Sequence, residues 1–107
     1  MDNDLAVLRL LGLGARGRLV VVGVDLTRKA VMNGKVKLAI VASDASRNSQ
    51  EKITPLLLAR GVSIINVASA TALGGAVGRD TTVVVGVLDD GLARGIRAAE
   101  SEIRRTG

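Results

Sequence analysis

The chain has 107 residues, of which 48% are hydrophobic, and its 15 Lys and Arg against 10 Asp and Glu give a formal net charge of +5. It contains no Cys and no His, which excludes disulfides, cysteine nucleophiles and the side chain best suited to acid–base catalysis near neutral pH. It also lacks Phe, Tyr and Trp, which excludes the aromatic platforms on which RRM and OB domains stack RNA bases.

The first half of the chain alternates between helical and strand patterns. Apolar residues at helical spacing predict a first helix over 5–11, and the glycines of Gly12–Gly17 are expected to end it. The run at 19–22 is rich in β-branched residues and predicts a buried strand. A second helical pattern ends at Asn33-Gly34, and a second strand pattern follows at 36–42.

The second half continues this alternation. A third helix is expected to begin at Asn48, and either to kink at Pro55 or to start afresh there. Strand patterns at 62–67 and 82–88 flank a short fourth helix, and the last helix begins at Asp89-Asp90. The alternation predicts the α/β class: a three-layer α/β/α sandwich with a central four-stranded sheet.

The stretch Gly12-Leu13-Gly14-Ala15-Arg16-Gly17 has the G-x-G-x-x-G spacing of dinucleotide-binding folds. That fingerprint requires a strand before the glycines and a helix after them, because the helix N-terminus supplies amides to the pyrophosphate. Here the order is reversed, and the acidic residue expected about 20 positions later is replaced by Val36-Lys37-Leu38. We therefore expect a helix stop and no cofactor.

Carboxylates follow three of the predicted strands, at Asp25, Asp44 and Asp89-Asp90. One hypothesis makes them an acidic, receiver-like site that binds Mg²⁺ or accepts a phosphoryl group. The alternative, which we favour, is that each caps the helix or turn after its strand, with no metal site.

Three basic residues flank the predicted junction between the first strand and the second helix, which reads Gly23-Val24-Asp25. They are Arg18, Arg28 and Lys29. The helix N-terminus and these side chains could together hold phosphate groups.

Four strings, in this order, resemble the ribosomal-protein superfamily of kink-turn RNA binders, of the L-seven-Ae and L-thirty-e type. They are LLGLGARGRLVVVG, LTRKAVMNGKVKLAIVASDAS, ITPLLLARGVSIINVAS and ALGGAVGRDTTVVVGVLDDGLARGI. The likeness covers nearly the whole chain and is strongest to the short bacterial branch, the YlxQ-like proteins. It implies the same α/β/α fold.

The resemblance also implies an RNA site. The family signature Gly-x-Asn-Glu-x-x-Lys falls on Gly23–Lys29, where Gly and Lys match but Asp25 and Leu26 replace Asn and Glu. A second family contact is the apolar loop after the third strand, which shelters an unstacked nucleotide. The predicted RNA-binding residues are Arg18, Gly23, Val24, Asp25, Leu26, Arg28, Lys29, Ala68, Ser69, Ala70 and Thr71.

The combined prediction is one domain over residues 1–107 that recognises structured, kink-turn-like RNA by shape and is not an enzyme. The partners implied are ribosomal or other kink-turn RNA and the ribosome, and we expect a monomer. No apolar run approaches the roughly 18–20 residues that span a bilayer, and Met1-Asp2-Asn3-Asp4 is not signal-like, so a cytoplasmic location is expected. The alternative function is a protein–protein adaptor that has lost specific RNA recognition, since Leu26 replaces a polar contact.

Overall fold

The structure is a computed structural model that describes the backbone of residues 2–106 and the side chains of residues 4–101. Helices and strands alternate along the whole chain. In order they are α1 (Asp2–Arg16), β1 (Val20–Val22), α2 (Val24–Met32), β2 (Leu38–Ala42), α3 (Arg47–Ala59), β3 (Ile64–Val67), α4 (Ala70–Ala76), β4 (Val84–Val87) and α5 (Asp90–Thr106). Each strand lies inside one of the four predicted runs. Within residues 2–106, no helix is long and apolar enough to cross a membrane.

The four strands form one mixed sheet in the order β1-β4-β2-β3. β4 runs antiparallel to both of its neighbours, β1 and β2, whereas β2 and β3 are parallel. The last residues of β1, β2 and β3 and the first residue of β4 therefore lie along one end of the sheet. We call this the carboxyl end, and we call the opposite end, where β4 finishes, the amino end.

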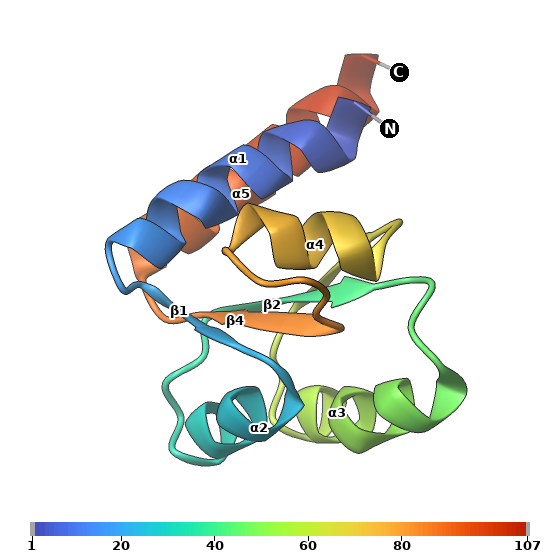
Figure 1. The fold of residues 1–107 in the computed structure, drawn as a ribbon. Coiled ribbons are helices and arrows are strands. Elements are labelled where there is room, and N and C mark those ends of the chain that lie inside the picture. Colours follow the sequence, from blue (N-terminus) through green and yellow to red (C-terminus); the bar gives the residue numbers. More distant parts are fainter. Residues whose placement is uncertain (1, 107) are drawn as a thin grey trace.

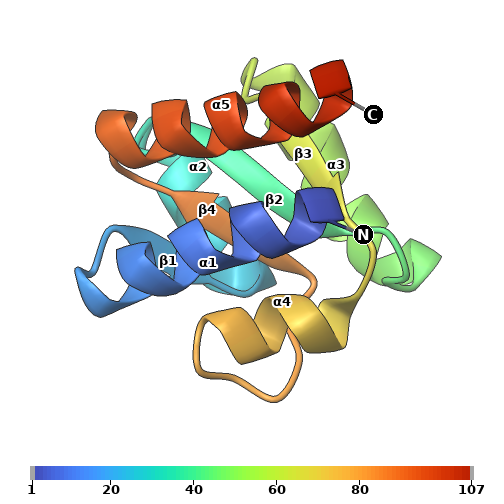
Figure 2. The same ribbon diagram turned by 90° about the horizontal axis from the view of Figure 1, so that it is seen from above.

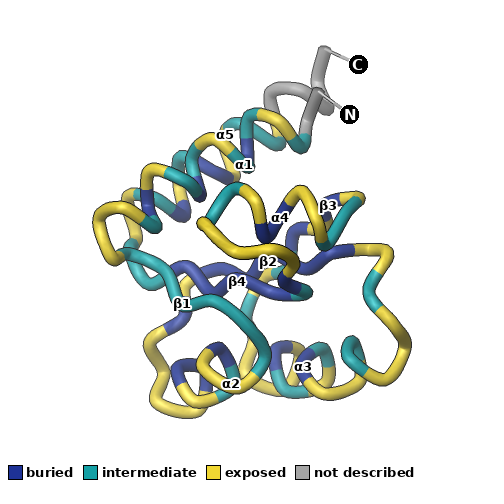
Figure 3. Tube along the Cα trace, viewed as in Figure 1, coloured by how far each residue is buried: buried dark blue, intermediate teal, exposed yellow. Residues whose placement is uncertain are grey.

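Helices cover both faces of the sheet, with α1, α4 and α5 on one face and α2 and α3 on the other (Figures 1 and 2). All five residues of β2 are buried, and their side chains alternate between the two faces. Leu38 and Ile40 belong to the core beneath α1, α4 and α5, whereas Ala39 and Val41 belong to the core beneath α2 and α3. The buried residues of Figure 3 accordingly line the sheet and the inner sides of the helices. The predicted α/β/α sandwich is confirmed.

The first helix is longer than predicted, because α1 continues through Gly12 and Gly14 to Arg16. Tertiary packing explains this difference. A Cβ added at Gly14 would collide with the Cδ2 atom of Leu92 in α5, and one at Gly12 would lie 3.0 Å from the carbonyl oxygen of Ala76 in α4. The glycines thus allow α1 to approach two other helices closely, which offsets their poor helix propensity of about 1 kcal/mol each.

The third helix also begins differently from the prediction. Its cap is Ser46, whose Oγ accepts a hydrogen bond of 3.1 Å from the backbone N–H of Ser49. Asn48 lies inside the first turn, so the predicted cap at Asn48 is wrong. The helix then continues through Pro55 without a new start. Pro55 is exposed, so water can reach the carbonyl that loses its intrahelical partner at this proline.

Candidate nucleic-acid interface

The junction between β1 and α2 is built on a glycine. Gly23 has φ 95° and ψ 164°, a region of backbone conformation that is essentially restricted to glycine. An added Cβ would meet nothing within 4 Å, so backbone conformation rather than packing requires glycine here. The Gly23 N–H donates a 2.9 Å hydrogen bond to the carbonyl of Val84, which fixes the junction to the start of β4.

The N-terminus of α2 has no side-chain cap. In contrast, α3 and α4 are capped by Ser46 and Ser69, and the Oδ2 atom of Asp89 accepts from the N–H of Leu92 in the first turn of α5. The N–H groups of the first turn of a helix have no intrahelical partner and carry partial positive charge. In α2 they face away from any protein cap and can donate to an anion.

The exposed face of α2 combines two opposite charges, Asp25 and Lys29 one turn apart, with apolar side chains. Leu26 is 53% exposed, and Lys29 lies on the same face one turn later. Met32 follows at 56% exposed. Arg28 points elsewhere, because its guanidinium donates to the carbonyl of Lys52 in α3.

Carboxylates hold the predicted apolar loop between β3 and α4. The N–H of Ala68 donates to Oδ2 of Asp4 at 2.8 Å, and the N–H of Ala70 donates to Oδ1 of Asp44 at 2.8 Å. Ala68 and Thr71 are exposed, whereas Ser69 and Ala70 are half-buried. The loop is therefore tied both to α1 and to the segment after β2.

The two predicted contact segments lie at the same end of the sheet, the carboxyl end. Both are anchored on the start of β4: Gly23 bonds to Val84, and the N–H of Thr82 donates to the carbonyl of Ala70 at 3.1 Å. Those two anchors are about 7 Å apart along extended chain. However, α2 and α4 lie on opposite faces of the sheet (Figure 1), and β1 and β3 are its two outer strands, so the segments flank the start of β4 from opposite sides.

The carboxyl end is not the basic surface that the sequence suggested. Asp4, Asp25 and Asp44 lie there, whereas Arg28 reaches toward α3. Arg18 precedes β1 and so lies at the amino end, away from Gly23. The structure therefore places the glycine, the helix N-terminus and the apolar loop at one end of the sheet, whereas Arg18 lies at the other end and Arg28 points toward α3.

The hypothesis that Asp44 and Asp89-Asp90 form one acidic site is wrong. Asp44 lies at the carboxyl end, and Asp89 lies at the amino end, where β4 finishes. Each accepts a hydrogen bond from the first turn of a helix. Among the described residues, no group of three His, Cys, Asp or Glu is placed to hold a metal ion. Asp89 caps the helix that follows it, as predicted. Asp44 lies in the turn after β2 and also accepts from the first N–H of α4, beside the Ser69 cap. The predicted cap at Asp25 is wrong, because α2 has no side-chain cap.

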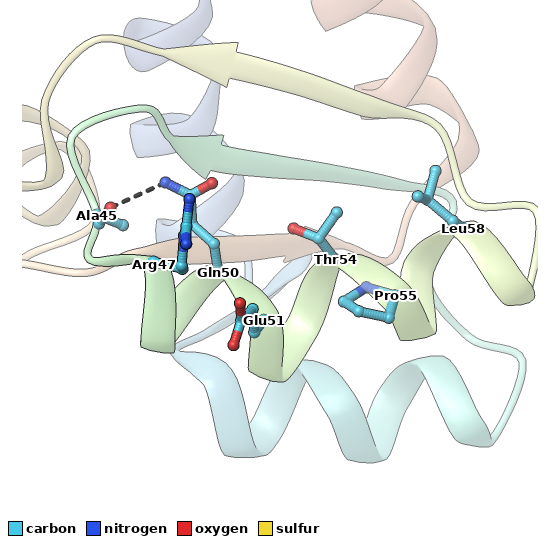
Figure 4. A pocket seen from close by; sticks show the side chains of 7 residues that line it. All are labelled: Ala45, Arg47, Gln50, Glu51, Thr54, Pro55 and Leu58. Carbon is cyan, nitrogen blue, oxygen red and sulfur yellow. Dashed lines mark hydrogen bonds between the residues drawn. The ribbon is translucent and has the colours of Figure 1, made fainter.

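Sequence reasoning missed a groove along α3, with a volume of about 610 Å³. Gln50 reaches from this helix to donate a 2.8 Å hydrogen bond to the carbonyl of Ala45 (Figure 4). Leu58, at the far end, is 67% exposed. The lining residues are Ala45, Arg47, Gln50, Glu51, Thr54, Pro55 and Leu58. The only sequence feature that could have indicated this groove is the pair Pro55 and Leu58, and both residues also fit an ordinary surface helix.

The fold and the glycine-based junction define an α/β/α protein of the ribosomal-protein type. The sequence model of the ribosomal protein L7Ae/L30e/S12e/Gadd45 family matches residues 6–104, and the chain belongs to this family. It is 40% identical over 84 residues to RNA-binding protein YlxQ of Bacillus subtilis (strain 168), covering 78% of this chain and 84% of that protein. It is 28% identical over 92 residues to RNA-binding protein YlxQ of Enterococcus faecium, covering 86% of this chain and 88% of that one.

Solved structures support the same assignment. A protein of unknown function from Bacillus halodurans C superposes with a TM-score of 0.81 at 36% identity, covering 89% of this chain and 96% of that chain. The 15.5kD RNA binding protein of Giardia lamblia superposes with a TM-score of 0.82 at 24% identity, covering 98% and 90%, and this likeness shows the fold alone. The family and both YlxQ proteins are described as ribosomal or RNA-binding proteins and not as enzymes, which confirms the expectation that the chain is not an enzyme.

Proposed function

We propose that this protein binds structured RNA at the carboxyl end of its sheet and recognises a kink-turn-like bend by its shape. One observation carries the proposal: in a chain of this family, Gly23 leaves the N-terminus of α2 uncapped and open. Backbone N–H groups at a helix N-terminus are suited to phosphate oxygens, and a glycine allows the RNA backbone to come close.

The other residues of the junction would assist in different ways. The ammonium of Lys29 can contact a phosphate or a base edge from the exposed face of α2. Leu26 and the exposed Ala68 offer apolar surface to a base that has left its stack. Asp25 opposes binding, because an ionised carboxylate repels phosphate and can only accept hydrogen bonds.

The test is a titration of fluorescently labelled kink-turn RNA, with and without its tandem G·A pairs, followed by anisotropy. We expect tighter binding to the intact kink turn. The variant Asp25→Asn supplies the amide of the family signature and removes a negative charge, so it should bind the intact RNA several-fold more tightly. Equal affinity for both RNAs, in the wild type and in Asp25→Asn, would refute kink-turn recognition.

A glycine pair provides the control for backbone effects. Gly23→Ala strains the junction and places a methyl group in the open approach, so it should reduce RNA affinity at least tenfold. Gly61 also has a positive φ, 69°, with nothing within 4 Å of an added Cβ, but it lies at the end of α3. Gly61→Ala should lower stability and leave affinity unchanged, provided that both variants are folded at the assay temperature.

A protein–protein adaptor is the second candidate function. It is favoured by the exposure of Leu26 and Met32 on one helix and by the acidic residues at the carboxyl end. A pull-down with and without RNase treatment separates the two functions. Partners that survive RNase support the adaptor, and partners lost with the RNA support RNA binding.

A further inference from the structure

Three chain segments meet at the amino end of the sheet. The N–H of Leu88 donates to the carbonyl of Leu19 at 2.8 Å, and the N–H of Lys37 donates to the carbonyl of Val87 at 2.7 Å. The Nη2 group of Arg97 then donates to the carbonyl of Lys37 at 2.9 Å, which ties α5 to the same row. The connections α1–β1, α2–β2 and β4–α5 thus form one continuous surface, at the left of Figure 1.

This surface is strongly basic. Exposed cations come from four different connections or helix ends around it, and they are Arg18, Lys35, Lys37, Arg60, Arg94 and Arg97. The acidic residues at this end are Asp89 and Asp90, and Asp89 already accepts the N–H of Leu92. The carboxylates Asp4, Asp25 and Asp44 lie at the opposite end together with the exposed Arg47, so cations exceed carboxylates at the amino end but not at the carboxyl end.

Arg18 supplies an independent observation, because its backbone is strained. It has φ 59°, and no other non-glycine residue described has a positive φ. It terminates α1 as the left-handed residue of a Schellman motif, with Arg18 N–H bonded to Ala15 at 3.2 Å and Leu19 N–H to Gly14 at 2.8 Å. Glycine is the usual residue there, yet the neighbouring glycine, Gly17, stands one position too early. The strained backbone holds the exposed Arg18 side chain at the start of β1, beside the end of β4.

The cations are spaced for an extended polyanion. Leu19 and Lys37 flank the end of β4 on its two sides, so the chain segments that carry Arg18 and Lys37 are about 10 Å apart, or two strand spacings. Arg97 holds its guanidinium in place by one bond to the backbone, and its remaining N–H groups can donate outward. Long, flexible side chains at this spacing can contact successive phosphates of one strand.

We propose that the amino end of the sheet is a second RNA-contacting surface, which binds the phosphate backbone without regard to sequence. The proposal rests on RNA being the partner of this protein, but not on kink-turn recognition. It assigns shape recognition to the carboxyl end and electrostatic attraction to the amino end. With extents of 34 × 27 × 25 Å, the protein would contact RNA at two opposite ends.

The probe is labelled oligo(U), a single strand that contains no kink turn. The double variant Arg18→Asn/Lys37→Gln removes two charges, and Asn tolerates the left-handed backbone at position 18. The slope of log K against log salt should fall in magnitude by about 1.4, and affinity near 0.15 M salt should fall about 15-fold, since each phosphate contact on a single strand contributes about a factor of 4 there. The matched control Lys52→Gln/Arg79→Gln loses the same charge from other surfaces and should leave the slope near the wild-type value.

Equal slopes for the two double variants would overturn the proposal, because net charge alone would then explain the binding. Kink-turn RNA with and without G·A pairs, measured in parallel, separates the two sites. If the amino-end variant loses oligo(U) but keeps its preference for the intact kink turn, both proposals are supported. If the salt slope of the amino-end variant falls while no protein prefers the intact kink turn, binding at the amino end is supported and kink-turn recognition is refuted. If the wild type binds neither RNA, both fail.

Discussion

Replacing Arg18 with glycine should make the protein more stable. The backbone of Arg18 has φ 59°, a left-handed conformation that costs a non-glycine residue about 1–2 kcal/mol. Glycine adopts this conformation without strain, but it loses about 0.4–1 kcal/mol more conformational entropy on folding. The net expectation for Arg18→Gly is a free energy of unfolding that is higher by about 0.5–1 kcal/mol. For a domain of this size, that corresponds to a rise in Tm of about 2–4 °C.

The assay is urea and thermal unfolding followed by far-ultraviolet circular dichroism. The chain has no Trp, Tyr or Phe, so its unfolding cannot be followed by intrinsic aromatic fluorescence. The helices contribute most of the dichroism signal, and α1, which Arg18 terminates, is one of the longest. A higher urea midpoint with an unchanged m-value would show that stability has changed without a change in the surface exposed on unfolding.

Arg16→Gly is the matched control, with the same chemical change two residues earlier. Arg16 lies in the last turn of α1, where glycine lowers stability by about 1 kcal/mol and loss of a cation near the helix C-terminus adds a few tenths. The two variants should therefore shift the urea midpoint in opposite directions. If Arg18→Gly destabilises as much as Arg16→Gly, the left-handed assignment of Arg18 is refuted, together with the strain argument for its role.

Three further predictions concern stability, each measured by the urea midpoint. Gly74→Ala should lower the free energy of unfolding by about 2–3 kcal/mol, because the added Cβ would lie 2.5 Å from the Thr81 Cα. Gly75→Ala should raise it by about 0.5–1 kcal/mol, because nothing lies within 4 Å of an added Cβ there. Equal effects of the two variants would contradict this packing. Thr27→Val should stabilise by about 1 kcal/mol, since Oγ1 is buried without a hydrogen-bond partner; a loss would point to a hidden partner. Asp44→Ala should cost about 1 kcal/mol, because the Ala70 N–H at the start of α4 loses its acceptor although the Ser69 cap remains, and an unchanged midpoint would contradict that contribution.

The strands and the layer architecture could be predicted from the sequence because they depend on local composition. All four runs rich in β-branched residues became strands, but the predicted burial of the first is wrong, because β1 is an outer strand and its three residues are only half-buried. The end of α1 could not be predicted in the same way. Gly14 is a poor helix former by itself, and its place inside α1 coincides with the close approach of Leu92, far along the chain, whose side chain fills the space beside it.

Much of the candidate site depended on topology, which the sequence does not state. Arg18 and Gly23 are five residues apart, yet a strand separates them and sends them to opposite ends of the sheet. Asp4 and Ala68 are 64 residues apart and are hydrogen-bonded. The family signature located the glycine junction, but the charges around it follow from the strand directions, so the basic end of the molecule could not be predicted from net charge alone.

The absence of aromatic residues gives this protein a useful spectroscopic property. Aromatic rings shift the NMR signals of nearby methyl groups through their ring currents, and this chain contains no such ring. Any ring-current shift that appears when RNA is added must therefore come from a base. A base over the β3–α4 loop would displace the methyl signals of Ala68 and Thr71, whereas a phosphate held by Arg18 or Lys37 would cause no ring-current shift. The protein's own methyl groups can thus distinguish contact with a base from contact with the backbone.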